Sequence, residues 1–266
     1  MVYLHSHQNP QDVSFLRIRC NDEIIQLMNE ISIGSHRLLM IALSQSNTIE
    51  HQIGLKFDAY DKITGATSNS KATKLKDIFY EIRDNCAFID STKTHFCASD
   101  SIMIFSIRPN WFNSKENRIV LIPRSFFAVN HKHNCSAYRL GINLYNRASN
   151  RRRKTLVLGV KTVNQLCGGK FSDNPEKIEK DWRKYTVEKI EDALDYLLYY
   201  GMIGDWGYII DNKKVNIPRT KEEEQESQQG NVMIEKMDLN RRYFSEYMNS
   251  KIYVDVFRPR NHVKEK

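Results

Sequence analysis

The sequence lacks the features that would place the chain in a membrane or cross-link it through disulfide bonds. No apolar run of about 18 residues occurs, and the N-terminus has no charged start followed by an apolar run. The five cysteines are odd in number, scattered and without a Cys-x-x-Cys pair, which is typical of a reducing compartment. We therefore predict a cytoplasmic protein with no membrane partner.

Motifs of common catalytic sites are also missing. There is no G-x-x-x-x-G-K-S/T phosphate loop, because the segment CGGKF lacks the first glycine and the hydroxyl residue. His131, His133 and Cys135 have no second ligand pair at zinc-finger spacing. We predict no catalytic residue, no metal site and no cofactor.

One enzymatic alternative comes from the segment DALDYLLYYGMIGDWGYII. Tyr196 and Tyr200 have the Tyr-x-x-x-Tyr spacing of rolling-circle nicking enzymes. Such enzymes also need two histidines that flank a hydrophobic residue on a strand, so that both side chains point to one face. His5-Ser6-His7 and His131-Lys132-His133 have polar central residues, which favours a scaffold role for the tyrosines, with Tyr200 partly buried near the helix end.

The residues that are present give a globular composition with a basic excess. The chain is 41% hydrophobic and 11% aromatic, which is typical of a packed core. The formal net charge of +8 favours a polyanionic partner where the positive charges gather locally. A length of 266 residues suits one large domain or two of ordinary size.

The first half of the chain predicts helices followed by a hairpin. Apolar residues recur at helical spacing over 22–43, where Gly34 and Ser35 divide two helices. The elements expected next are a strand at 55–57, a brief helix from 58 to 65, a longer helix with Leu75, Ile78, Phe79 and Ile82 on its apolar face, and strands in THFCA and SIMIFSI.

The second half repeats this order after a connecting segment, RIVLIPRSFFAV, with a boundary near Pro123. The expected elements are a helix in SAYRLGINLYNRA, a strand in TLVLG, a short helix in VKTVNQLCGG, a long helix before Gly201 and a hairpin in GDWGYIIDNKKVNIP. A shift of 115 residues places Leu75, Ile78, Phe79, Ile82 and Phe88 over Ile190, Ala193, Leu194, Leu197 and Ile203. The two halves are therefore predicted to be related domains.

Helix, strand, two further helices and a hairpin is the order of a winged helix. We predict an α+β, predominantly helical fold with tandem winged-helix domains, that is, helix-turn-helix units with a β-hairpin wing. The expected division is 1–122, 123–220, and an acidic and polar linker with a helix–strand tail at 221–266. One irregular α+β domain is the alternative.

In a winged helix the third helix enters the major groove and the wing lies along the backbone. Both third helices open with cations and carry acids later, Glu81 and Asp84 in one and Glu191, Asp192 and Asp195 in the other, so only the front half of each is expected in the groove. The predicted DNA-contacting residues are Ser68, Asn69, Lys71, Lys74, Arg183, Lys184, Thr186 and Lys189 on the helices, Arg151, Arg152, Arg153 and Lys154 in a basic run, and Lys213 and Lys214 at the second wing tip.

Three phrases of the first half, SHRLLMIALSQ, FDAYDKITG and ATKLKDIFYEIRDNCAFID, resemble the N-terminal winged helix of iteron-binding plasmid replication initiators, the Rep superfamily. AYRLGINLYNR, LVLGVKTVNQLCG and IEDALDYLLYYGMIGDWGY are similar to the second domain of related initiators. The resemblance covers about residues 22 to 217.

The resemblance implies a protein that binds repeated double-stranded origin sites, helps to open the adjacent duplex and recruits host replication proteins. It also implies dimers that repress their own promoter and monomers that activate the origin, with no catalytic residue. A winged-helix transcriptional regulator is the alternative within the class of DNA-binding proteins.

Overall fold

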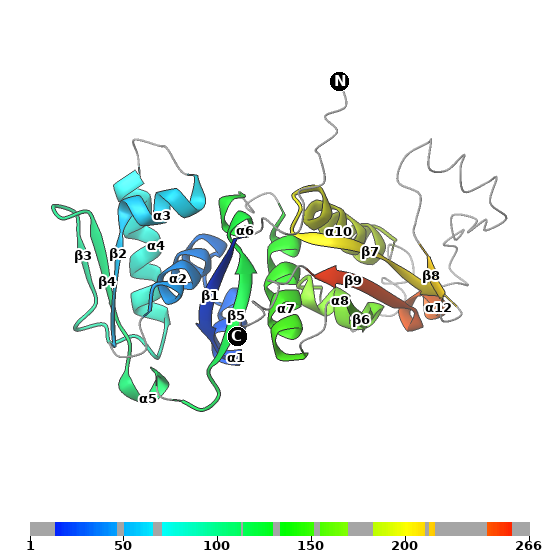
Figure 1. Ribbon diagram of the computed structural model, residues 1–266, viewed down its shortest axis with the longest axis horizontal. Helices are drawn as coiled ribbons and strands as arrows, with labels where there is room; N and C mark the ends of the chain where they lie inside the picture. The colour runs from blue at the N-terminus through cyan, green and yellow to red at the C-terminus, as the bar shows by residue number, and fades with distance from the viewer. Residues whose placement is uncertain are drawn as a thin grey trace, which may run out of the picture.

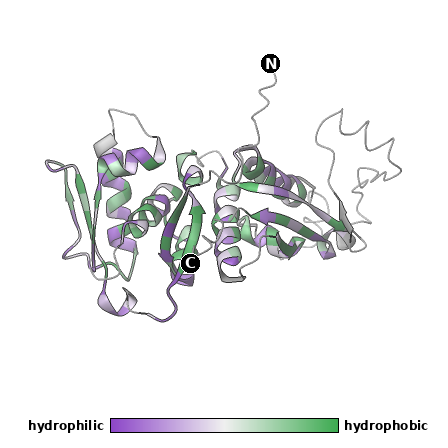
Figure 2. Ribbon diagram, in the orientation of Figure 1, coloured by the Kyte–Doolittle hydropathy of each residue, from purple (hydrophilic) through white to green (hydrophobic). Residues whose placement is uncertain are grey.

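The computed structural model describes residues 14–46, 51–65, 71–112, 114–129, 134–151, 155–169, 183–210, 213–215 and 244–256. Figure 1 shows an elongated molecule with a sheet toward each end, and with helix α7 (Cys135–Arg151) and a two-stranded ribbon between them. Apolar and polar residues alternate along the strands and helices in Figure 2, as in elements with one buried face. The expected mixture of helices and strands is confirmed. No helix within the described ranges is long and apolar enough to cross a membrane.

The N-terminal half contains a three-stranded antiparallel sheet in the order β2, β4, β3. Its elements are α2 (Ile33–Ser44), β2 (Gln52–Lys56), α3 (Phe57–Thr64), α4 (Lys71–Asn85), β3 (His95–Cys97) and β4 (Ile102–Ser106). Gly65 ends α3 with a φ of 66°, in the left-handed region that favours glycine. The predicted hairpin is confirmed, because β3 pairs with β4.

The break between the first two helices lies earlier than the sequence predicted. α1 (Asp22–Gln26) and the short η1 (Leu27–Asn29) precede it, and α2 starts after Ser32. Ser32 has an extended backbone, and its hydroxyl accepts a hydrogen bond of 3.2 Å from the Ser35 amide, so it caps the helix. The predicted break at Gly34 was wrong, because this glycine lies in the first turn of α2.

The C-terminal half contains a four-stranded sheet in the order β6, β9, β7, β8. Besides α7, its elements are β6 (Thr155–Gly159), α8 (Val160–Leu166), η3 (Arg183–Glu188), α10 (Lys189–Tyr199), β7 (Ile203–Ile210), β8 (Lys213–Val215), α12 (Phe244–Asn249) and β9 (Lys251–Val256). The predicted hairpin is confirmed, since β7 pairs with β8 in a register that places Tyr208 opposite Val215.

Strand β9 comes from the tail that the sequence predicted as a separate segment. It lies between β6 and β7 and pairs antiparallel with both, so that Val254 is opposite Leu156 on one side and Trp206 on the other. These three side chains are buried. The tail therefore supplies an inner strand of the second sheet, whereas the predicted boundaries near residues 122 and 220 stay predictions.

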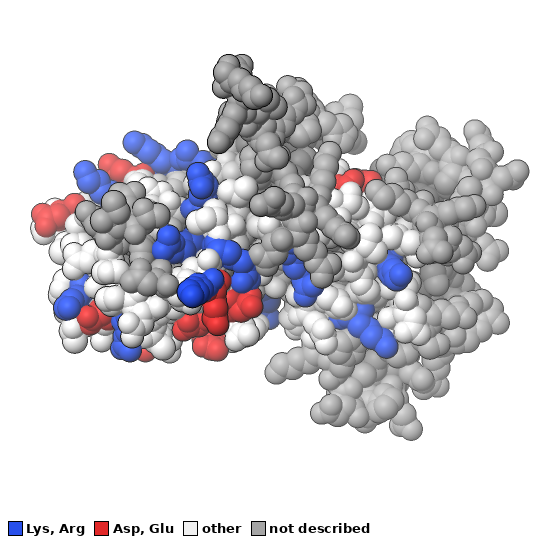
Figure 3. Space-filling view, turned by 60° about the horizontal axis from the view of Figure 1, so that its bottom comes forward, with Lys and Arg blue, Asp and Glu red and all other residues white. Residues whose placement is uncertain are grey.

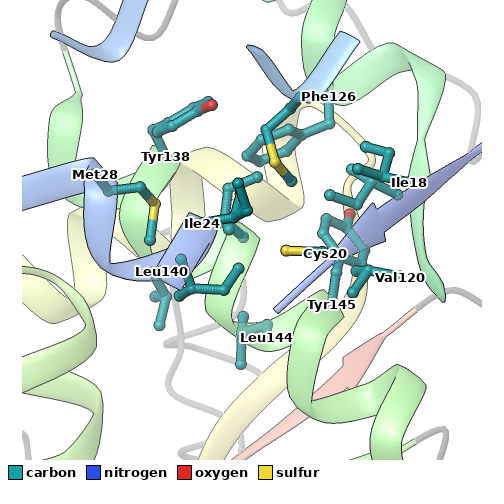
Figure 4. Packing of buried hydrophobic residues seen from close by; sticks show 14 of the residues in the cluster. Ile18, Cys20, Ile24, Met28, Val120, Phe126, Tyr138, Leu140, Leu144 and Tyr145 are labelled. Carbon is teal, nitrogen blue, oxygen red and sulfur yellow. The ribbon is translucent and has the colours of Figure 1, made fainter. Parts of the chain in front are cut away.

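The two halves meet at α7 and at the ribbon of β1 (Phe15–Cys20) and β5 (Arg118–Pro123). Between β4 and β5 lies α5 (Pro109–Phe112), and β5 leads into α6 (Arg124–Ala128). Figure 4 shows Ile18 and Val120 of the ribbon beside Phe126 of α6 and Tyr145 of α7. All four are fully buried, so one continuous apolar core joins the halves.

A polar contact crosses the same junction. His36 of α2 is fully buried, with Nδ1 2.8 Å from the Tyr138 hydroxyl of α7 and Nε2 2.9 Å from the Ile24 carbonyl oxygen of α1. Since a carbonyl only accepts, Nε2 carries the hydrogen and Nδ1 accepts from Tyr138. Burial lowers the pKa of His36 to about 4, so the ring is neutral at physiological pH.

Candidate nucleic-acid interface

Helix α4 separates an apolar face from a charged one. Leu75, Phe79 and Ile82 are buried against the N-terminal half, whereas Lys74 and Lys76 are exposed. Lys71 is the first residue of the helix, as expected, although Ser68 and Asn69 lie outside the described residues. Of the predicted contacts on this helix, Lys74 thus has the exposed position that a phosphate or base contact requires.

The face of α4 opposite its apolar side carries further cations and an aromatic ring after the lysines at its start. The Lys76 Nζ atom lies 6.0 Å from the centre of the Tyr80 ring, and the Arg83 guanidinium carbon lies 4.3 Å from it. Arg83 also forms an ion pair of 2.7 Å with its neighbour Asp84. Lys76, Tyr80 and Arg83 were not among the predicted contacts, although their spacing of four and three residues places them on one helix face.

Glu81 points toward α2 and is bound there by three donors. Its Oε1 accepts from the Ser32 amide at 2.7 Å, and its Oε2 accepts from the hydroxyls of Ser32 at 2.7 Å and Ser35 at 2.5 Å. Although burial raises the pKa of Glu81, the hydrogen bonds from Ser35 and Ser32 hold it below its ordinary value. This acid is therefore engaged inside the domain rather than directed at a ligand.

Helix α10 is preceded by a π-helical turn, η3, that holds Arg183 and Lys184. Thr186 in this turn is only 7% exposed, so it faces inward, and Lys189 at the start of α10 is half-buried. The predicted base contact of Thr186 is not favoured by this position, because a buried hydroxyl does not reach a base edge. The missed signal was periodicity, since Thr186 lies four residues before the buried Ile190.

The later acids of α10 are bound to the strand behind the helix. Asp195 Oδ1 accepts from the Trp206 indole nitrogen at 2.8 Å, and Glu191 Oε1 accepts from the Tyr208 hydroxyl at 3.0 Å. Trp206 and Tyr208 are buried, and these two hydrogen bonds join β7 to α10. The expected repulsion between phosphate and these acids does not follow, because both carboxylates are directed into the domain; Asp192, by contrast, is exposed.

No family model matches the chain, and no curated protein matches it. Among solved structures, the Pi initiator protein in complex with iteron DNA matches 93% of this chain and 98% of its own, with a TM-score of 0.53 and 10% sequence identity. The chain shares the fold of the Pi initiator protein.

The match to the Pi initiator protein extends over both halves, well beyond any single motif. It supports the predicted resemblance to replication initiators at the level of the fold. Only 10% of the residues are identical to those of the Pi initiator protein. The assignment of the charged side chains above therefore rests on the geometry of this chain alone.

Two other predicted clusters are described only in part. Arg151 is the last residue of α7, whereas Arg152, Arg153 and Lys154 lie outside the described residues. In β8, Lys213 and Lys214 pair opposite Ile210 and Ile209. The two lysines thus lie at the start of the second strand of the predicted hairpin.

Figure 3 shows where charges gather on one face of the molecule. Lys and Arg side chains lie over the N-terminal half and the middle, with a group of Asp and Glu beside them. The face therefore carries cations in local groups, as a polyanion-binding surface requires.

The tyrosines of the enzymatic alternative lie at the end of α10. The ring centres of Tyr196 and Tyr200 are 4.7 Å apart, and Tyr200 is 44% exposed. Burial and the neighbouring Tyr200 raise the pKa of Tyr196, which favours a protonated phenol over a phenolate nucleophile. The histidine pairs at 5–7 and 131–133 lie outside the described residues. Within the described residues, no group of three or more His, Cys, Asp or Glu is placed to hold a metal.

Proposed function

We propose that the chain is a sequence-specific double-stranded DNA-binding replication initiator of a plasmid or similar mobile element. The observation that carries this proposal is the match to the Pi initiator protein, solved with iteron DNA, over 93% of the chain. The proposed initiator binds repeated origin sites and recruits host replication proteins in the cytoplasm. It has no catalytic activity of its own, and it forms a homodimer when it represses its own promoter.

In this proposal each half is a winged-helix domain. α4 and the segment from η3 into α10 are the recognition helices, and the hairpins β3–β4 and β7–β8 are the wings. The order β2, β4, β3 of the first sheet supports the assignment of the first half, because β2 pairs with the second strand of the hairpin; in the second sheet β9 lies between β6 and the hairpin. The cations Lys74, Lys76 and Arg83 on α4, Arg183 and Lys184 in η3, and Lys213 and Lys214 on β8 are proposed to contact phosphates and base edges.

The proposal is tested by selection from a random duplex library with the full chain. An initiator enriches one sequence, and its affinity for that duplex falls steeply with salt, with a logarithmic slope of about 0.9 for each phosphate neutralised. Enrichment of a palindrome that occurs only at a promoter would favour the transcriptional regulator instead. Failure to enrich any sequence would contradict both functions.

A further inference from the structure

The two proposed recognition helices share an unusual use of their acidic residues. On a helix that faces DNA, a carboxylate near the middle normally opposes binding, because phosphates repel it. Glu81 in α4, and Glu191 and Asp195 in α10, have partners inside their own domain instead. Each helix thus directs at least one acid toward the element behind it, whereas Asp77 and Asp192 stay exposed.

We propose that Glu81 of α4 and Asp195 of α10 are positioning residues for DNA recognition. Each carboxylate ties a recognition helix to the element behind it and thereby fixes the orientation of its outward side chains. The inference rests on the proposed function, since it concerns the same DNA-binding surface. Its consequence runs against simple electrostatics: removing either negative charge weakens recognition of the specific site.

The geometry around Glu81 supports this role in α4. Three hydrogen bonds of 2.5–2.7 Å join one carboxylate to the first turn of α2, through an amide and two hydroxyls. Ser35 is fully buried, so the hydrogen bond from its hydroxyl is part-buried, whereas the two from Ser32 lie at the surface. Tyr80 directly precedes Glu81, and Arg83 follows Glu81 by two residues. A rotation or tilt of α4 at this point therefore moves the side chains of Tyr80 and Arg83.

The geometry around Asp195 supports the same role in α10. Trp206 is 1% exposed, and its indole nitrogen donates to Asp195, so the bond joins the helix to an inner face of the second sheet. Tyr208 donates to Glu191 one turn earlier and accepts from the Tyr247 hydroxyl of α12 at 3.0 Å. Two successive turns of α10 are therefore tied to β7, and through Tyr247 to α12.

The test compares each positioning acid with an exposed acid on the same helix. In α4, Glu81→Gln is paired with Asp77→Asn, and in α10, Asp195→Leu is paired with Asp192→Leu; Asp77 and Asp192 are exposed. Affinities are measured for the duplex that the wild-type chain enriches from a random library and for a shuffled duplex of the same composition. Each pair removes one negative charge, so a difference within a pair does not come from net charge.

We expect the Asp77 and Asp192 variants to bind both duplexes about two- to threefold more tightly, because a repulsive charge near phosphate is gone. Glu81→Gln and Asp195→Leu should bind the selected duplex about tenfold more weakly, the cost of roughly one base contact, with the shuffled duplex nearly unaffected. The ratio of specific to non-specific affinity therefore falls only in the positioning variants. A merely stabilising residue would lower both affinities together, in proportion to the folded fraction.

Two variants that leave the net charge unchanged decide the outcome if Glu81→Gln or Asp195→Leu does not fold. Ser35→Ala removes one donor to Glu81, and Trp206→Phe removes the donor to Asp195 while retaining a large ring. Both should lower the specificity ratio in the same direction with no change in charge. If Glu81→Gln or Asp195→Leu tightens binding to both duplexes, or if the charge-neutral variants keep the wild-type ratio, the positioning role is refuted. Failure of the wild-type chain to enrich any duplex would refute the proposed function instead.

Discussion

Acid should loosen the junction between the two halves through one buried histidine. His36 is fully buried between Tyr138 and the Ile24 carbonyl, and its pKa is lowered from 6.5 to about 4. Protonation would place a desolvated charge in the core and add a second ring hydrogen where Nδ1 now accepts from Tyr138. We therefore predict that His36 makes the free energy of unfolding depend on pH below neutrality.

The sign follows from the lowered pKa. In the unfolded chain His36 takes up a proton near pH 6.5, whereas in the folded chain it does so only near pH 4. Its contribution to stability is therefore complete above pH 6.5 and is lost as the pH falls toward 4. A shift of this size corresponds to a loss of about 2 kcal/mol between pH 7 and pH 4.5.

Urea unfolding of the wild type and of His36→Gln at pH 7 and pH 4.5 measures this contribution. The variant should be less stable at pH 7 because it loses the paired ring, but its stability should fall by about 2 kcal/mol less on acidification. His95→Gln, which replaces an exposed histidine of strand β3, is the matched control and should lose as much stability on acidification as the wild type. Equal acid losses in the wild type and His36→Gln would refute the assignment of a neutral buried ring.

Three further predictions concern packing, DNA contact and catalysis. Gly141→Ala should destabilise the chain by roughly 1–3 kcal/mol in thermal unfolding, because a Cβ at this position would lie 2.4 Å from the buried Phe126 ring. Charge reversal of Arg183 and Lys184 together should weaken binding to the selected duplex at least tenfold; unchanged affinity would remove η3 from the interface. When supercoiled DNA is incubated with the chain and a divalent metal, neither the wild type nor Tyr200→Phe should nick it. Nicking by the wild type that is lost in Tyr200→Phe would overturn the non-enzymatic proposal.

Local elements were predictable where short-range chemistry specifies them. Gly65 adopts a left-handed backbone at the end of α3, and β7 and β8 pair within the segment predicted as a hairpin, so α3 and the β7–β8 hairpin were predicted correctly. The start of α2 was misplaced because Gly34 was treated as a break, whereas Ser32 offered the better helix cap. The hydrogen bond from the Ser35 amide to the Ser32 hydroxyl sets the start of α2 at Ser32 rather than at Gly34.

Long-range pairing was not predictable from the same patterns. The strand character of KIYVDV was visible, but its place between β6 and β7 depends on partners about 50 and 100 residues away, which alternation alone does not identify. The orientation of Glu81 was missed for a related reason. Helical periodicity places it beside the apolar face, but only the packed structure brings Ser32 and Ser35 of α2 to it.

The central claim is that the chain recognises repeated sites at an origin of replication. Footprinting of the full chain on the DNA that flanks its own gene tests this claim most directly. The account predicts several protected direct repeats, spaced by roughly 20 base pairs, about two helical turns, so that successive protomers lie on one face of the duplex. Protection of a single promoter palindrome, or no protection at all, would contradict it.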